Sequence, residues 1–121
     1  MRFRAPVQCD RRRRTIGGYL PQVFERFGSD HPAVIEAYRD LVERLHEAGL
    51  LSARERRLAK LGIAIGRESE GGVRSHARKA LAEGIEREAI RQVALLAIST
   101  GGYPAAMATY GWINEVLDRE G

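Results

Sequence analysis

Apolar side chains recur at steps of three and four residues along most of this chain, which is the spacing of helices with one buried face. No segment alternates apolar and polar residues in the way that a half-buried β-strand does. Glycine and proline residues interrupt the pattern at short intervals, where they mark the ends of helices. The sequence therefore predicts an all-α fold, a single-domain bundle of about six helices.

The first three predicted helices are separated by residues that begin or end a helix. A short first helix is expected to end at Gly28, and Asp30 and Gly49 are expected to cap and to end the second. Ser52 and Glu55 have the spacing of a capping box, in which the hydroxyl and the carboxylate each accept a free backbone N–H group. We therefore expect the third helix to begin after Ser52.

Glycine and proline also divide the second half of the chain. Residues 73–83 are predicted to form the fourth helix, with Gly84 just past its end, and the glycine pair 71–72 is interpreted as a turn before it. The fifth helix is expected to begin at Glu86, an atypical cap, and Pro104 suits the first position of the sixth. The third and fifth helices are apolar around almost their whole circumference. We therefore expect a homo-oligomer, for which a trimer and a hexamer are both considered.

The basic charge of the chain is concentrated at its beginning. The 20 Lys+Arg and 16 Asp+Glu residues give a net charge of +4. Residues 1–14 carry six arginines and one aspartate, a net +5, so the rest of the chain carries a net −1. Runs of like charge are usually solvated, so residues 1–18 are predicted to be a flexible basic arm, followed by a helical domain at 19–121. Nucleic acid is not an expected partner, because its binding would depend on the arm alone; binding through residues 11–14 is the weaker alternative.

Cys9 is the only cysteine, which excludes a disulfide within the chain, a cysteine-rich zinc site and a dithiol redox centre. No metal-binding cluster or phosphate-binding loop is present, so no metal is expected. No stretch approaches the roughly 18 to 20 consecutive apolar residues of a membrane span, and the N-terminus lacks the apolar block of a signal peptide. We therefore expect a cytoplasmic protein without a membrane partner.

Residues 66–84 contain the side chains best suited to chemistry. Glu68 and Glu70 precede His76, which lies on the apolar side of the predicted fourth helix and is expected to point inward. A histidine held by a carboxylate is the commonest device for proton transfer at neutral pH. A histidine at the edge of the core that is hydrogen-bonded to the backbone fits the same spacing, so both interpretations remain open.

Several segments of the chain occur in an order and at a spacing typical of one protein family. They are LSARERRLAKLGIAIG, HARKALAEGI, EREAI, VALLAIS, YPAA and NEVL. By these segments, residues 20–118 resemble the carboxymuconolactone decarboxylase family, which also contains the alkylhydroperoxidase D-like proteins. The resemblance implies the helical alkylhydroperoxidase D-like fold.

The peroxidase members of that family carry a C-x-x-C-x-x-x-H pattern, and its histidine corresponds to His76 here. The two thiol positions correspond to Ser69 and Gly72, and the place of a glutamate that usually stands nineteen residues before the histidine is taken by Arg57. Peroxide reduction needs a thiolate that attacks oxygen and a second thiol that resolves the sulfenic acid. The resemblance therefore does not imply peroxidase activity for this chain.

The decarboxylase members do not use a cysteine pair, and their histidine with a following arginine is matched by His76 and Arg78. The resemblance implies a lyase or isomerase that acts on a small anionic molecule without a metal or organic cofactor. In this hypothesis His76 transfers the proton together with Glu70 or Glu68, and an arginine holds the substrate carboxylate by two contacts. The candidate arginines are Arg67, Arg74 and Arg78. The alternative is a non-catalytic member that keeps the scaffold as an oligomeric binding or assembly module.

Overall fold

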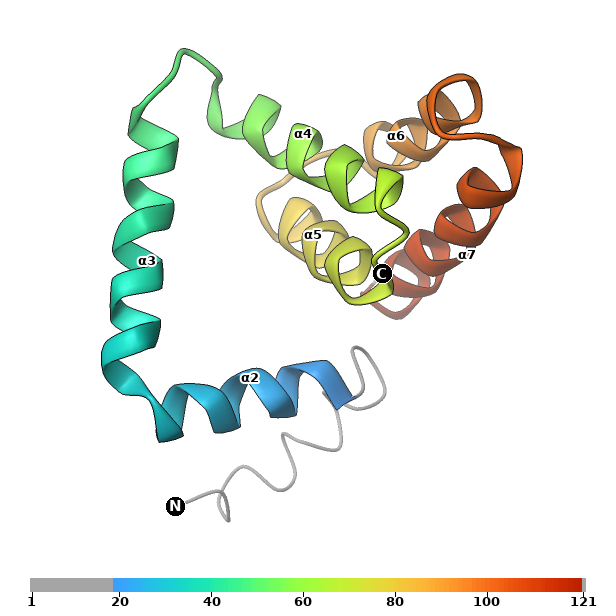
Figure 1. The fold of residues 1–121 in the computed structure, drawn as a ribbon. Coiled ribbons are helices and arrows are strands. Elements are labelled where there is room, and N and C mark those ends of the chain that lie inside the picture. Colours follow the sequence, from blue (N-terminus) through green and yellow to red (C-terminus); the bar gives the residue numbers. More distant parts are fainter. Residues whose placement is uncertain (1–18, 121) are drawn as a thin grey trace. The chain divides into compact units, whose positions relative to one another are not determined.

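The computed structural model describes residues 19–120. Within this range the chain forms helices joined by short links and contains no strand, which confirms the predicted all-α fold (Figure 1). The helices are α2 (Tyr19–Asp30), α3 (Pro32–Glu47), α4 (Ala53–Gly66), α5 (Glu70–Ala82), α6 (Arg87–Thr100) and α7 (Tyr103–Glu120).

The chain divides into two compact units, residues 1–50 and residues 51–121. Every buried side chain of the described residues belongs to the second unit, where α4, α5, α6 and α7 enclose one hydrophobic core. Its largest fully buried side chains are Leu61, Ile65, Ile90, Ile113 and Leu117. The predicted arm at residues 1–18, with Cys9, lies outside the described residues, so its boundary with a domain at 19–121 remains a prediction.

In the first unit, the predicted end of α2 and the predicted cap of α3 are both wrong. The backbone N–H of His31 donates to Phe27 O at 2.8 Å, so helical hydrogen bonding continues past Gly28 and α2 ends at Asp30. The carboxylate of Asp30 accepts a hydrogen bond from Arg26 Nε at 2.9 Å, one turn earlier in α2. Asp30 is thus engaged within its own helix, and His31 is the N-cap of α3 without a side-chain capping bond.

In the second unit, the capping box predicted at the start of α4 is confirmed. Ser52 Oγ accepts the backbone N–H of Glu55 at 3.1 Å, and Glu55 Oε1 accepts the backbone N–H of Ser52 at 2.8 Å. Leu61, Ala64 and Ile65 then face the core from the same side of α4. The box therefore fixes where α4 begins, and the apolar residues decide which of its faces packs inward.

The start of α5 differs from the prediction by three residues. The helix begins at Glu70 rather than at residue 73, so the glycine pair 71–72 lies in its first turn and is not a separate turn. Ser69 is the N-cap, and its hydroxyl accepts the backbone N–H of Gly72 at 3.2 Å. The hydroxyl therefore compensates for the weak helix preference of two glycines. At the other end of α5, Gly84 has a positive φ of 87°, as expected of a residue just past a helix.

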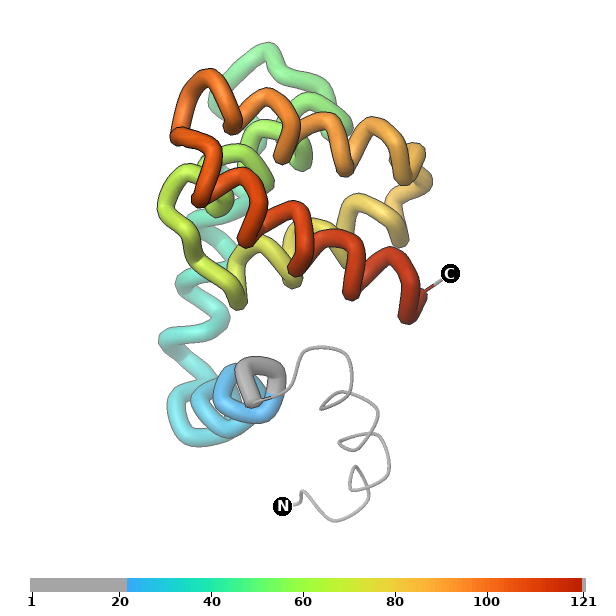
Figure 2. The backbone as a smooth tube through the Cα atoms, turned by 90° about the vertical axis from the view of Figure 1, so that its right-hand side faces the viewer, coloured from blue at the N-terminus to red at the C-terminus, as the bar shows by residue number. Residues whose placement is uncertain are grey.

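Helices α6 and α7 lie side by side and are joined by a tight link at Gly101 and Gly102 (Figure 2). Gly102 has a φ of 101°, a conformation that side chains disfavour. Glu86 is the N-cap of α6 without a side-chain capping bond, as the sequence suggested, because its carboxylate accepts Arg54 Nη1 of α4 at 2.7 Å. Among residues 19–120, no helix combines the length and the apolar character that crossing a membrane requires.

Candidate functional site

His76 lies on α5 at the boundary with α4. Its neighbour Ala77 and the residues Val73 and Ala80 are fully buried, whereas His76 itself is only partly buried. The face of α5 that packs on α4 therefore carries the imidazole at its edge. Arg57 of α4 reaches this edge, and its Nη1 atom lies 2.8 Å from Nδ1 of His76.

Arg57 is held from its other side by Glu83, the C-cap residue of α5. Arg57 Nε and Nη2 donate to the two carboxylate oxygens of Glu83 at 3.0 Å and 2.9 Å. Such a two-point contact fixes the plane of the guanidinium group. Glu83, Arg57 and His76 therefore form a continuous hydrogen-bonded chain that joins α4 to the middle of α5 and to its C-cap.

The environment of His76 favours the neutral imidazole. Burial is the largest cause of a pKa that is lowered from 6.5 to about 4. Arg57, Lys79 and Lys60 lower it further because positive charges oppose protonation of the ring. Glu83 acts in the opposite direction but is itself paired with Arg57, whose hydrogen bond lowers the pKa of Glu83. At neutral pH the ring is therefore uncharged.

A pocket of about 200 Å³ opens beside His76. The two other long polar side chains in its wall are Lys60 of α4 and Arg67, the C-cap residue of α4. Both are cationic and no acidic residue belongs to the lining. The complete lining is Lys60, Ile63, Ala64, Arg67, Ser69, Gly72 and His76. The pocket therefore has the charge that suits a small anion.

The structure brings two of the six predicted site residues, His76 and Arg67, to this pocket. Glu68 lies in the link between α4 and α5 with a positive φ of 53°, and its side chain is exposed. Glu70 is exposed and accepts a hydrogen bond from Arg74 Nε at 3.0 Å. Neither carboxylate lines the pocket, and neither is bonded to the ring of His76.

The remaining predicted arginines also have other environments. Arg74 is bound to Glu70 and, through Nη2, to Glu115 of α7 at 2.6 Å, so it joins α5 to α7. Arg78 is partly buried, and burial lowers its pKa. Its Nη1 atom is the only buried side-chain nitrogen or oxygen without a hydrogen-bond partner among the described residues. Both arginines lie two positions from His76, which directs them away from its face of α5.

Sequence reasoning missed the roles of Arg57, Lys60 and Glu83. The resemblance gave Arg57 only as a replacement for a glutamate, and its contact with the ring of His76 is shown by the structure. Lys60 lies one turn after Arg57 on α4 and therefore on the same face. Glu83 follows His76 by two turns on α5, so it is aligned with the ring along that helix.

The two positions that hold thiols in peroxidase relatives have structural roles here. Ser69 caps α5 with its hydroxyl. A Cβ atom on Gly72 would lie 2.9 Å from Ser69 Oγ and 3.2 Å from Ala64 Cβ, which is too close for an undisturbed side chain. The start of α5 is therefore packed around a serine at position 69 and a glycine at position 72.

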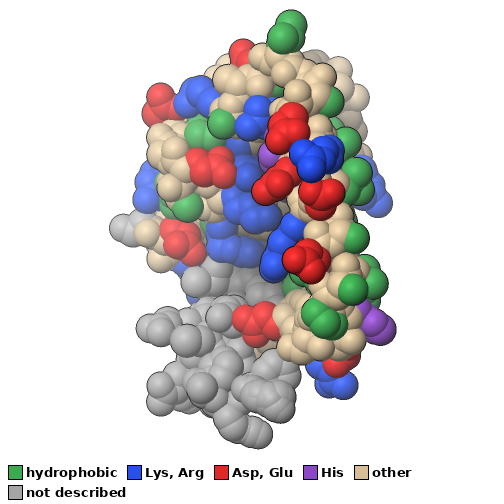
Figure 3. All heavy atoms as spheres, turned by 90° about the vertical axis from the view of Figure 1, so that its left-hand side faces the viewer, with side chains coloured by type: hydrophobic (Ala, Val, Ile, Leu, Met, Phe, Trp, Pro, Cys, Tyr) green, Lys and Arg blue, Asp and Glu red, His purple; other side chains and the backbone are tan. Residues whose placement is uncertain are grey.

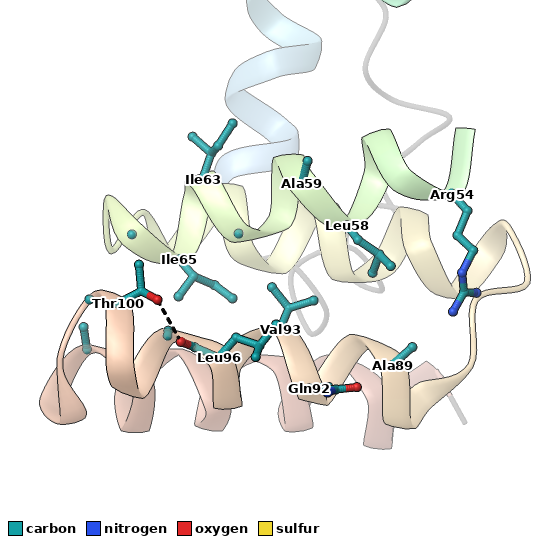
Figure 4. A pocket seen from close by; sticks show the side chains of 15 residues that line it. Arg54, Leu58, Ala59, Ile63, Ile65, Ala89, Gln92, Val93, Leu96 and Thr100 are labelled. Carbon is teal, nitrogen blue, oxygen red and sulfur yellow. Dashed lines mark hydrogen bonds between the residues drawn. The ribbon is translucent and has the colours of Figure 1, made fainter. Parts of the chain in front are cut away.

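A larger pocket of about 750 Å³ lies between α4 and α6. Figure 4 shows Leu58 and Ile65 of α4 pointing toward α6, and Val93 and Leu96 of α6 pointing back toward α4. Polar side chains stand near its ends, with Arg54 at one end and Thr100 at the other. The pocket is therefore a mainly apolar hollow with a single cationic side chain in its lining, that of Arg54.

Within residues 19–120, no group of three or more His, Cys, Asp or Glu side chains is arranged to hold a metal ion. Comparison with curated proteins found no match, and comparison with solved structures found none. The model of one protein family, described as the carboxymuconolactone decarboxylase family, matches residues 32–115, which is more than half of the chain. The match includes α3, α4, α5, α6 and most of α7, and it spans both pockets. The chain belongs to the carboxymuconolactone decarboxylase family.

Proposed function

We propose that the chain is a lyase or isomerase of the carboxymuconolactone decarboxylase type that acts on a small molecule with at least one carboxylate group. The substrate binds in the pocket beside His76, and His76 is the side chain that meets the reacting group. The proposed reaction uses no metal ion or organic cofactor. The proposed location is the cytoplasm, since Cys9 offers no disulfide partner within the chain.

The observation that carries this proposal is the composition of the smaller pocket. Lys60 and Arg67 stand in its wall together with an imidazole that has one ring nitrogen engaged by Arg57. Arginine holds a carboxylate by two parallel hydrogen bonds, and lysine adds a point charge. A carboxylate held by these cations lies within the small volume that His76 also borders.

The chemistry of decarboxylation explains why such a pocket is useful. When a carboxylate leaves as CO₂, its bonding electron pair stays on the substrate and is delocalised onto a neighbouring oxygen. A hydrogen bond to that oxygen, or delivery of a proton to the substrate, lowers the barrier. The sequence assigns the proton to His76 with Glu68 or Glu70. The proposal depends on His76, because neither glutamate is part of the pocket lining.

The test is an assay of CO₂ release and of double-bond shift with a panel of lactone diacids and keto diacids. We expect wild-type protein to turn over at least one of them and His76→Ala to lose most of that rate. His31→Ala, which removes a histidine outside the pocket, serves as the matched control and should retain the wild-type rate. Equal rates for wild type and His76→Ala would remove His76 from the reaction.

A second candidate function is a non-catalytic oligomeric module, and the exposed apolar residues of the second unit favour it. Ile63 of α4 is 64% exposed, and Leu95 and Leu96 of α6 are 51% and 60% exposed. On the face of the molecule drawn in Figure 3, hydrophobic side chains lie among interleaved basic and acidic ones. Large exposed apolar areas often mark protein–protein contacts. We propose that a second copy of the chain covers the apolar side of α4 and α6 in a homo-oligomer, with or without catalysis.

A further inference from the structure

We infer that Arg57 is a positioning residue that holds His76 in the tautomer with its proton on Nε2, so that His76 meets a bound anion as a hydrogen-bond donor and not as a base. The tautomer follows from the geometry of α4 and α5 alone. The role toward an anion rests on the proposed function, since it takes the pocket beside His76 as the substrate site.

The hydrogen bond between Arg57 and His76 has only one possible direction. A guanidinium group carries five N–H donors and no acceptor. Arg57 Nη1 lies 2.8 Å from His76 Nδ1, so the arginine must donate and Nδ1 must accept. A nitrogen that accepts has no hydrogen of its own, and a neutral imidazole carries its single proton on the other nitrogen. Nε2 is therefore the protonated atom.

Arg57 is fixed in place by contacts on both of its sides. Its side chain is only 15% exposed, and two of its nitrogens are already bound to the carboxylate of Glu83. Rotation away from His76 would break this two-point contact as well as the bond to the ring. A lysine at the same position has a single nitrogen and could not satisfy both partners in this planar arrangement. The orientation of Arg57 is thus set by Glu83.

The other ring nitrogen of His76, Nε2, is left for a ligand. His76 lines the pocket that also contains Lys60 and Arg67. No residue within 19–120 forms a hydrogen bond with Nε2, and this atom is not among the buried polar atoms that lack a partner. Among the described residues, the Nε2–H group is therefore a donor without a partner, on a side chain that lines a cationic pocket. An anion held by Arg67 can accept from it.

The charges around the ring maintain this arrangement over a wide pH range. Arg57 and Lys60 face the imidazole from α4, and Lys79 faces it from α5. The carboxylate of Glu83 also lies nearby, but it is the partner of Arg57. To accept a proton, His76 would have to give up its bond from Arg57 and become a further cation among these groups. The ring therefore stabilises negative charge on a ligand without changing its own charge.

The test uses the full-length protein labelled with ¹⁵N in its histidine rings. The ring signals of His76 are assigned by their absence in His76→Gln and followed by NMR between about pH 5 and pH 8, the range of ordinary histidine titration. We expect a protonated-type Nε2 and an unprotonated-type Nδ1 throughout. A proton on Nδ1, or a charged ring at neutral pH, would overturn the inference.

Variants of Arg57 separate a positioning role from a structural one. In Arg57→Gln, the pKa of His76 should rise by about one unit or more, and both tautomers should become populated. Arg54→Gln is the matched control. Arg54, like Arg57, is an arginine of α4 that is paired with a glutamate, but its partner is Glu86 at the start of α6. Arg54→Gln should leave the ring signals of His76 unchanged. If Arg57→Gln does not fold, Arg57→Lys keeps the charge and should still give mixed tautomers. An unchanged tautomer in the folded variant overturns the role of Arg57.

A titration of the same labelled protein with maleate, a small dicarboxylate, tests the role toward an anion. We expect maleate to shift the Nε2–H signal of wild-type His76 and to leave the tautomer unchanged. A protonated Nε2 that does not respond to maleate would overturn the anion-binding part and the proposed pocket, but not the tautomer. A response to maleate with the proton on Nδ1 would overturn the tautomer while the proposed pocket stands.

Discussion

Arg57 and Glu83 are 26 positions apart and are joined by two parallel hydrogen bonds of 3.0 Å and 2.9 Å. The pair ties the second turn of α4 to the C-terminal end of α5. Because Arg57 also donates to His76, the geometry of the candidate site depends on this contact between two helices. Stability and site chemistry are therefore linked through one side chain.

Glu83→Gln should destabilise the second unit by about 1 kcal/mol, a modest cost because solvent screens the partly exposed carboxylate. The substitution leaves the nearly buried guanidinium of Arg57 without its charged partner. Urea unfolding followed by circular dichroism measures the change. Glu86→Gln is the control, since it removes the carboxylate of the more exposed Arg54 pair and should have the smaller effect. Equal effects of the two substitutions would contradict this ranking of the pairs.

The lowered pKa of His76 predicts a specific dependence of stability on pH. The unfolded chain has a histidine pKa near 6.5 and the folded ring one of about 4, so between these values the unfolded state binds more protons. Stability from this group is therefore complete above about pH 6.5 and is lost as the pH falls toward 4. The loss should be on the order of 1–2 kcal/mol after solvent screening. The free energies of unfolding of wild type and His76→Gln should therefore converge as the pH falls toward 4. A difference between them that stays constant with pH would contradict the lowered pKa of His76.

Gly72→Ala should destabilise the protein by about 1–2 kcal/mol, although alanine is normally the better helix residue. The new Cβ atom would approach Ser69 Oγ to 2.9 Å, and moving that hydroxyl would weaken the cap of α5. Gly66→Ala is the matched control, because no atom lies within 4 Å of its added Cβ. Thermal unfolding should show a lower Tm for Gly72→Ala alone. If Gly72→Ala is as stable as wild type, the close contact is not a constraint.

Leu96→Glu should shift the protein toward smaller species if copies of the chain associate through the apolar side of α4 and α6. The substitution places a charge where Leu96 is 60% exposed and borders the larger pocket. Light scattering coupled to size-exclusion chromatography measures the mass of each species. Ser99→Glu adds the same charge to α6 outside the pocket lining and should leave the oligomer intact. A wild-type chain that is monomeric at micromolar concentration would contradict self-association.

The fold was predictable where local chemistry decides it. The spacing of Ser52 and Glu55 was enough to place the start of α4, because the two groups satisfy each other within one turn. The errors arose where another contact intervened. Asp30 accepts from Arg26 and does not cap α3, and Ser69 caps α5 early enough to include two glycines in the helix. A residue type that favours a helix cap does not show whether its side chain is already hydrogen-bonded to a neighbour.

The site was only partly predictable, for a physical reason of the same kind. Helical spacing placed His76 on the inner side of α5, and Arg67 reaches the same pocket. The partners of the ring, however, come from a different helix and from the end of α5, and no spacing within residues 66–84 points to Arg57. Glu70 was a reasonable carboxylate partner by proximity, but it lies within reach of Arg74, one turn later on the same helix.

The proposed function requires that the pocket beside His76 receives a small anion. Isothermal titration calorimetry of maleate binding to wild type, His76→Ala and the control His31→Ala tests it most directly. A hydrogen bond to a charged ligand corresponds to a change in affinity of about tenfold or more, so His76→Ala should bind maleate at least that much more weakly while His31→Ala binds as wild type. Identical affinities for wild type and His76→Ala would contradict the claim.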